Sequence, residues 1–200
     1  MMPKIVDKEA KKKEIVQSSL GVFAKKGFKD TIMSDIAMSA GIGKGTIYEY
    51  FPNKQAIFIE AFGSIQRELD SEITASVSSH PDPGKKLTAF IGSYCRFYEK
   101  LPEALMIYID VWVEAIKSRK NKIKNQTLAL DSYYQQIIEI LKQGIEAGSF
   151  KSIDTELTSR VIFSSLGGLV FHWITGGKAF PIIKAAEELA ETILNRIKKN

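Results

Sequence analysis

The residues best suited to chemistry in this chain lie together in one short segment, residues 44–50, which combines a cation, hydroxyl groups and a glycine. A lysine can bind a phosphate or the O6 and N7 acceptors of guanine, and the methyl group of threonine suits the thymine C5-methyl group. A glycine lets the backbone come close to a base or sugar, and tyrosine hydroxyls can reach a phosphate. The segment is therefore suited to binding DNA, through Lys44, Gly45, Thr46, Tyr48 and Tyr50.

The sequence around this segment predicts a short helix, a glycine-containing turn and a second short helix over residues 35–51. Ile47 and Phe51 are four residues apart and predict the inner face of the second helix, so that Gly45 and Glu49 point away from the core. In a helix-turn-helix motif, the second helix presents its outer face to the major groove of DNA.

Some of these side chains have a second interpretation that the sequence leaves open. Glu49 can accept a hydrogen bond from the N4 amino group of cytosine, or it can repel phosphate and tilt the helix. Tyr48 and Tyr50 could pack between helices instead of touching DNA, and Lys54 could be a solvated charge beside the start of the next helix.

The run from Ile36 to Lys54 closely resembles the signature of the tetracycline-repressor (TetR) family of bacterial transcription regulators, and residues 14–28 resemble the family's first helix with its terminating glycine. The resemblance implies further contacts with DNA. Lys54 matches a lysine that contacts the DNA backbone, and Thr31 and Ser34 match the region where the preceding helix meets a phosphate.

The glycines of the turn allow one competing interpretation, a nucleotide-binding loop. Gly41, Gly43 and Gly45 do not fit the dinucleotide template, and Lys44 is followed by glycine where the P-loop needs Ser or Thr. The TetR family commonly has Ser or Ala at the position of Gly43, so we expect a more flexible turn that lacks a capping hydroxyl group.

Charge is concentrated at the N-terminal end of the chain. Residues 1–55 carry ten lysines and six acidic residues, a net charge of +4, whereas the whole chain carries +5. This excess lowers the free energy of approach to phosphates. The single cysteine, Cys95, excludes an intrachain disulfide and fits a reducing cytoplasm, where we expect it to act as a small buried hydrophobe rather than a redox sensor.

The spacing of apolar residues predicts an all-α fold of about nine helices, with no stretch of sustained β alternation. We expect residues 1–55 to form a three-helix DNA-binding domain and residues 56–200 to form an effector-binding and dimerisation domain. The predicted helices cover residues 7–26, a short second helix opened by Thr31 or Ser34, then 44–50, 54–78, 85–100, 102–117, 127–147, 154–175 and 181–198.

The larger domain carries aromatic side chains that combine an apolar body with a polar tip, as a ligand pocket requires. The resemblance implies an effector cavity among the helices that carry them. We therefore expect a small, largely apolar effector in a cavity of about 300–1,000 Å³. The expected lining residues are Tyr94, Tyr98, Tyr108, Trp112 and Tyr134.

Small residues interrupt an otherwise apolar predicted helix at Ser164, Ser165, Gly167 and Gly168. Each glycine costs helical stability, about 1 kcal/mol relative to alanine, and close approach of another helix would offset that cost. The resemblance implies a homodimer formed by the last two helices. The longest apolar run, residues 161–174, is too short to cross a bilayer, and no leader opens the chain, so we expect a cytoplasmic protein without membrane partners.

These observations predict a DNA-binding transcriptional regulator, a repressor that a small molecule releases from a palindromic double-stranded operator. We expect no cofactor, no metal and no enzymatic activity, because the two histidines, His80 and His172, form no catalytic pattern. One alternative is a DNA-binding protein of the same fold without an effector. Another is a helical enzyme or lipid carrier with a vestigial helix-turn-helix, which the basic bias of residues 1–55 argues against.

Overall fold

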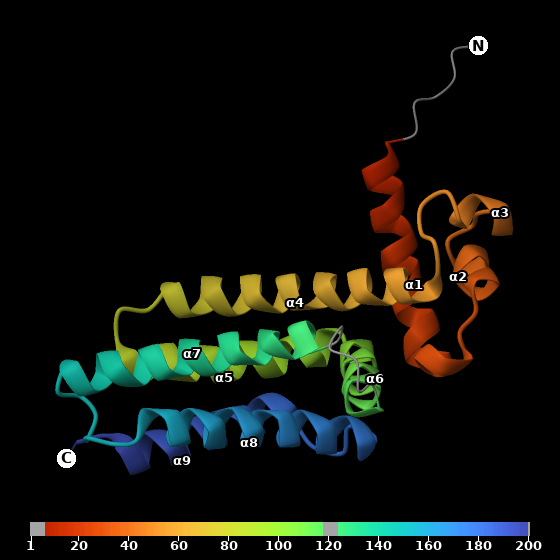
Figure 1. Cartoon of the computed structure of the whole chain (residues 1–200). Coiled ribbons are helices and arrows are strands. Elements are labelled where there is room, and N and C mark those ends of the chain that lie inside the picture. Colours follow the sequence, from red (N-terminus) through yellow and green to blue (C-terminus); the bar gives the residue numbers. More distant parts are fainter. Residues whose placement is uncertain (1–6, 118–123, 200) are drawn as a thin grey trace. The chain divides into compact units, whose positions relative to one another are not determined.

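The computed structural model describes residues 7–117 and 124–199, except for the side chains of residues 112, 114–117 and 124–130. Within that part of the chain all regular structure is helical, apart from one isolated bridge, so the predicted all-α fold is confirmed (Figure 1). In chain order the helices are α1 (Lys8–Asp30), α2 (Met33–Ser39), α3 (Lys44–Ile47), α4 (Lys54–Ser78), α5 (Pro83–Lys100), α6 (Glu103–Lys117), α7 (Lys124–Glu146), α8 (Thr155–Thr175) and α9 (Ile182–Ile197).

The chain forms two compact units. Unit 1 comprises Met1–Arg67 and Glu103–Lys117, and unit 2 comprises Glu68–Pro102 and Ser118–Asn200. Helix α4 begins in unit 1 and ends in unit 2, while α6 belongs entirely to unit 1. These units divide the chain differently from the functional domains expected at residues 1–55 and 56–200.

Most predicted helix bounds lie within a few residues of the observed ones, and α4 matches its prediction at both ends. The third helix is shorter than predicted, because the α-helix ends at Ile47 instead of Tyr50. Beyond it the backbone tightens into turns in which the amide of Tyr48 donates to the Gly45 carbonyl at 3.2 Å, and the amide of Tyr50 donates to the Ile47 carbonyl at 3.2 Å. The chain therefore continues in helical turns to Tyr50, with hydrogen bonds that span three residues instead of four.

Helix α1 is the central element of unit 1. The side chain of Asp7 caps its start by accepting hydrogen bonds from the amides of Glu9 and Ala10 at 3.0 and 3.2 Å. Near its end Gly27 has φ +76°, a left-handed conformation that breaks the helix. The buried face predicted through Ile15, Ser19 and Phe23 is observed, but Val22 is only half-buried, and Val16 and Leu20 complete the face instead.

Helix α6 packs along α1 within unit 1. The carboxylate of Asp110 on α6 accepts a hydrogen bond from the amide of Phe28 at 2.7 Å, directly after the break at Gly27. The rings of Tyr108 on α6 and Phe62 on α4 lie 6.1 Å apart. Residues more than eighty positions apart in the sequence thus meet at the end of α1.

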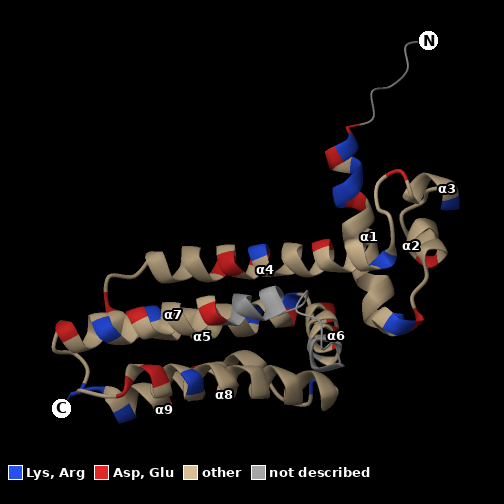
Figure 2. Ribbon diagram, viewed as in Figure 1, with Lys and Arg blue, Asp and Glu red and all other residues tan. Residues whose placement is uncertain are grey.

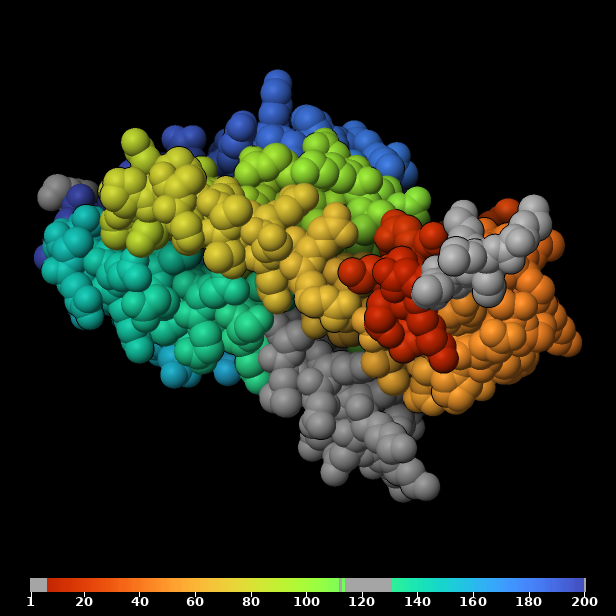
Figure 3. Space-filling model, turned by 90° about the horizontal axis from the view of Figure 1, so that it is seen from above, coloured from red at the N-terminus to blue at the C-terminus, as the bar shows by residue number. Residues whose placement is uncertain are grey.

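In unit 2, helices α5, α7, α8 and α9 pack alongside one another (Figure 1). The C-terminal part of α4, yellow in Figure 3, lies on the surface of this unit beside α7, which is teal. The chain leaves α7 through a tight turn in which the amides of Ser149 and Phe150 both donate to the Gly144 carbonyl at 2.9 Å. Residues 149–151 then pair with the end of the chain, where the Lys151 amide donates to the Ile197 carbonyl at 2.8 Å.

Gly144 is required by this turn, because a Cβ at that position would overlap the ring of the buried Phe150. We therefore expect Gly144→Ala to lower the free energy of unfolding by about 1–3 kcal/mol, the usual cost of overpacking. Gly21→Ala is the matched control. Gly21 is exposed on α1, and no atom lies within 4 Å of the position that an alanine methyl group would occupy there, so the same change should raise stability by about 1 kcal/mol. Urea unfolding of both variants checks this, and equal midpoints would contradict it.

Candidate nucleic-acid interface

The turn between α2 and α3 is built around Gly41. This residue has φ +65°, which a side chain would strain. The Gly41 amide donates to the Met38 carbonyl at 3.2 Å, and the Ile42 amide donates to the Ala37 carbonyl at 3.0 Å. These bonds satisfy carbonyls at the end of α2 and turn the chain sharply into α3.

Helix α2 is fixed to α1 by polar contacts at both of its ends. The hydroxyl of Ser39 donates to the Ser18 carbonyl at 3.0 Å, and the Lys26 ammonium lies 2.7 Å from the Asp35 carboxylate. The hydrogen bond from Lys26 lowers the pKa of Asp35 below its usual value of 3.8, and the bond from the Ile32 amide acts in the same direction. The carboxylate is therefore ionised at neutral pH, and it also caps the start of α2.

The predicted inner and outer faces of α3 are observed. Ile47 and Phe51 are buried, whereas Lys44, Gly45 and Glu49 are exposed. Tyr48 is 50% exposed, and Thr46 and Tyr50 are half-buried at the edges of the same face. The exposed face of α3 thus combines an ammonium group, the backbone of a glycine and two tyrosine hydroxyl groups, and it lies opposite the buried side chains of Ile47 and Phe51.

Gly43 is the N-cap residue of α3, and no side chain caps the helix there. This agrees with the lost capping hydroxyl expected from the sequence. The surrounding charge is basic: Figure 2 shows lysines along the first turns of α1, at its far end and at the start of α3. Such charge favours phosphate binding around the exposed face of α3.

Thr31 and Ser34 were predicted to contact DNA near the start of α2, and they differ in exposure. Thr31 is fully buried, and its hydroxyl donates to the Gly27 carbonyl at 2.7 Å. This bond closes the turn that follows the break in α1. Ser34 is half-buried in the first turn of α2, where helix amides without intrahelical partners can bind a phosphate.

Lys54, the first residue of α4, has internal partners that the sequence did not suggest. Its ammonium group donates to the carbonyls of Phe28, Lys29 and Thr31 at 2.8, 2.7 and 2.7 Å. It also lies 4.9 Å from the centre of the Phe28 ring. Because an ammonium group has three N–H bonds, all of them are used within unit 1, and a phosphate contact by Lys54 must replace one of them.

The residues predicted to bind an effector lie in both units. Tyr94 and Tyr98 on α5 are buried in unit 2, Tyr134 on α7 is half-buried there, and Tyr108 on α6 belongs to unit 1. The side chain of Trp112 lies outside the described residues. The five-residue pocket therefore remains a prediction.

Three tyrosines of unit 2 meet on one phenylalanine of α8. The Phe163 ring lies 5.6 Å from Tyr94, 5.4 Å from Tyr133 and 5.0 Å from Tyr134. Tyr94 in turn lies 5.1 Å from Tyr98. The sequence does not distinguish Phe163 from the other aromatic residues, because its central position depends on how α5, α7 and α8 pack.

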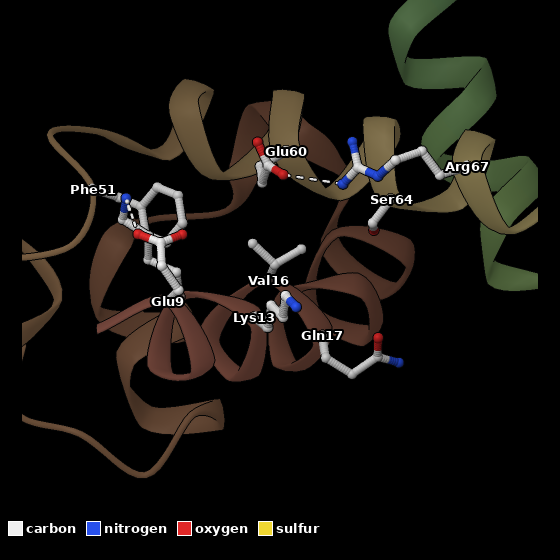
Figure 4. A pocket seen from close by; sticks show the side chains of 9 residues that line it. Glu9, Lys13, Val16, Gln17, Phe51, Glu60, Ser64 and Arg67 are labelled. Atoms are coloured by element: carbon white, nitrogen blue, oxygen red, sulfur yellow. Dashed lines mark hydrogen bonds and ion pairs between the residues drawn. The ribbon is translucent and has the colours of Figure 1, made fainter. Parts of the chain in front are cut away.

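The described part of the chain has surface cavities with volumes suited to small molecules, and the two below include no predicted effector residue. One, of about 390 Å³, lies in unit 1 between α1 and α4, with Val16 and Phe51 among its lining residues and an ion pair of Glu60 and Arg67 (3.1 Å) on its wall (Figure 4). The other, of about 430 Å³, lies in unit 2 and is lined mainly by polar residues of α7.

Cys95 is completely buried in α5, and burial raises the pKa of its thiol to about 12. The thiolate is the reactive form of cysteine, so this side chain is a poor nucleophile at neutral pH. This agrees with the expected role as a small hydrophobe.

Comparison with known proteins places this helix-turn-helix in a defined family. Residues 15–61 match the family described as "Bacterial regulatory proteins, tetR family", and residues 58–196 match "YsiA-like protein, C-terminal region". The chain belongs to the TetR family. The TetR-like resemblance and the prediction of a DNA-binding transcriptional regulator are thereby confirmed.

Individual relatives agree with this assignment over most of their length. The chain is 28% identical to the HTH-type transcriptional regulator YhgD of Bacillus subtilis, over 82% of this chain and 84% of that protein. A transcriptional regulator from Saccharomonospora viridis in complex with choline has a TM-score of 0.85 at 22% identity, covering 96% and 99% of the two chains. FadR from Bacillus subtilis in complex with stearoyl-CoA has a TM-score of 0.80 at 20% identity, covering 91% and 97%.

The internal bonds of Lys54 predict a large effect on stability. Lys54→Met keeps the apolar stem but leaves three carbonyls without their donor, so we expect the free energy of unfolding to fall by about 2–3 kcal/mol. Lys44→Met is the control, because Lys44 is exposed and should change stability by less than about 0.5 kcal/mol. Urea unfolding at pH 7 measures both variants. Unchanged stability of Lys54→Met would show that these bonds contribute nothing.

Proposed function

We propose that this TetR-family regulator is a cytoplasmic repressor that binds a palindromic operator and is released from it by a small, largely apolar effector. The observation that carries the DNA-binding part is the exposed face of α3 above the buried Ile47 and Phe51. The family of transcription regulators to which the chain belongs supports it. No part of the proposal requires a cofactor or a catalytic step.

The proposed DNA contacts divide into two sets. The residues of the first set lie at an open surface without giving up a carbonyl partner: Lys44, Gly45, Thr46, Tyr48, Tyr50 and, at the start of α2, Ser34. In the second set, Thr31 and Lys54 must give up a carbonyl partner to touch a phosphate through their side chains. We therefore propose that these two act on DNA binding mainly by holding the segment between α1 and α2 in place.

We propose that two copies of the chain pair through α8 and α9. One face of α8 presents apolar side chains to solvent: Leu157 is 61% exposed, Val161 57% and Phe171 43%. The expectation that the apolar run of residues 161–174 is too short to cross a bilayer was wrong on length and composition alone, because the whole of α8 is long and apolar enough; 33% of its apolar stretch is buried. A partner helix explains this exposed stripe, because Gly168 lies within it and has no atom within 4 Å of where its Cβ would be.

The effector is proposed from the ring cluster of unit 2 together with the ligands of two similar structures. Tyr94 and Tyr134 contact Phe163, and Tyr98 contacts Tyr94. Tyr108 and Trp112, which the sequence also suggested, belong to unit 1 and stay a prediction from the sequence. The two solved structures carry stearoyl-CoA and choline, one an anion with an apolar chain and the other a small cation. We propose an acyl-chain effector, because the cluster offers an apolar surface of rings.

Phosphate contacts predict a change in salt dependence. If Lys44 binds a phosphate, Lys44→Ala should weaken operator binding and reduce the slope of log K against log salt by about one. Lys142→Ala on α7 should leave the slope unchanged. Fluorescence anisotropy of a labelled operator between about 50 and 200 mM salt measures this. Identical slopes for the wild type and Lys44→Ala would remove Lys44 from the phosphate contacts.

The proposed dimer predicts a shift in oligomeric state. A leucine in place of Gly168 should prevent close approach of the paired helices, so that Gly168→Leu becomes largely monomeric and loses operator binding. Glu156→Leu adds the same side chain to α8 outside the exposed stripe and should remain dimeric. Sedimentation velocity separates the two variants, and a fully dimeric Gly168→Leu protein would contradict the interface.

The effector proposal predicts ligand-dependent release of the operator. Stearoyl-CoA should weaken operator binding at least tenfold, whereas choline should not, because only a ligand with different affinities for the two states shifts the equilibrium. Trp112→Ala should need a higher ligand concentration while keeping its operator affinity. If neither ligand changes operator binding, the effector-independent alternative is favoured.

A further inference from the structure

We infer that Arg160 on α8 is the specificity-determining residue of the effector site and selects ligands with an anionic group next to an apolar chain. This inference rests on the proposed function, because it concerns the effector site within unit 2. The decisive feature is a surface cation that lies directly beside the buried ring cluster.

A row of contacting side chains connects the surface residue Arg160 with the interior of unit 2. The guanidinium carbon of the exposed Arg160 lies 5.2 Å from the centre of the half-buried Tyr134 ring. The ring centres of Tyr134 and Phe163 lie 5.0 Å apart, and those of Phe163 and the buried Tyr94 lie 5.6 Å apart. The positive charge therefore lies at the outer end of this row, and apolar rings follow inward.

The charge of Arg160 is available to a ligand. Among the residues that the structure describes, no carboxylate lies within 4.0 Å of this guanidinium, although other cations such as Lys26, Arg67 and Lys100 have such partners. Stacking over Tyr134 orders the guanidinium plane without using its five N–H donors. These donors can bind a carboxylate or phosphate in the fork geometry that suits both groups.

The position of Arg160 on α8 also fits this role. With 3.6 residues per turn, Arg160 falls between the exposed stripe, which includes Leu157 and Val161, and the buried side, which includes Phe163. A ligand head group bound there would lie at the edge of the ring cluster while its apolar chain displaced Phe163. A quaternary ammonium ligand would meet a like charge at the same point, which disfavours it.

The test varies the ligand charge and the protein charge together. The probes are cis-parinarate, a linear fluorescent fatty acid anion, and its neutral methyl ester, titrated into the full-length protein at about pH 7.5. We expect the wild type to bind the carboxylate at least tenfold more tightly than the ester. Arg160→Gln should reduce this preference to less than twofold, and Arg160→Lys should keep part of it. Arg196→Gln, which removes an exposed arginine of α9, should keep the full preference.

The inference is overturned if Arg160→Gln keeps the tenfold preference, or if the wild type binds both probes equally or binds neither. Operator binding, measured in the same samples, separates this inference from the proposed function. A charge preference that depends on Arg160 while the operator stays bound supports the inference and contradicts the effector role. Equal release of the operator by parinarate from the wild type and Arg160→Gln supports the effector role and contradicts the inference.

Discussion

Three carbonyl oxygens at the end of α1 bind one ammonium group, and the placement of the DNA-binding surface depends on that contact. The last carbonyls of a helix have no intrahelical partners and carry partial negative charge. Lys54 satisfies those of Phe28 and Lys29, together with that of Thr31 beyond the helix, from the first residue of α4.

The same few residues are fixed from a second direction. The Phe28 amide donates to Asp110 of α6 at 2.7 Å, and the Phe28 ring lies 4.6 Å from Phe58 of α4. Helices α1, α4 and α6 thus determine where the chain leaves Gly27 and enters α2. Because α2 and the turn at Gly41 determine the direction of α3, the exposed face of α3 is held in place by contacts made within unit 1.

The helix-turn-helix could be predicted from the sequence because its signals are local. Ile47 and Phe51 share one face by spacing alone, and a glycine is needed where the turn adopts φ +65° at Gly41. The role of Lys54 could not be predicted in this way, since its partners lie 23 to 26 residues earlier in the chain. The partner of Asp110 is 82 residues away. Long-range polar contacts of this kind leave no periodic pattern in the sequence.

In the larger domain, the helices could be predicted from the sequence pattern, whereas the cluster of rings depends on how the helices pack. Its helices and the small residues of α8 were visible in the sequence, and the exposed stripe with Leu157 and Val161 agrees with a surface that another helix covers. The proposed effector site has a weaker signal in the sequence, because a tyrosine with an apolar body and a polar tip suits a packed core as well as a pocket. Only the packing of α5, α7 and α8 identifies Phe163 as the centre of the rings and Arg160 as the charge beside them.

The central claim, that α3 of a paired TetR-family regulator reads a specific operator, is tested most directly by sequencing the DNA fragments that the full-length protein selects from a random pool. We expect one enriched motif with two inverted half-sites, whose centres lie about 10 base pairs or a multiple of that apart, since a two-fold dimer places its recognition helices on one side of the duplex. No enrichment over the input pool, or an enriched motif without inverted symmetry, would contradict this claim.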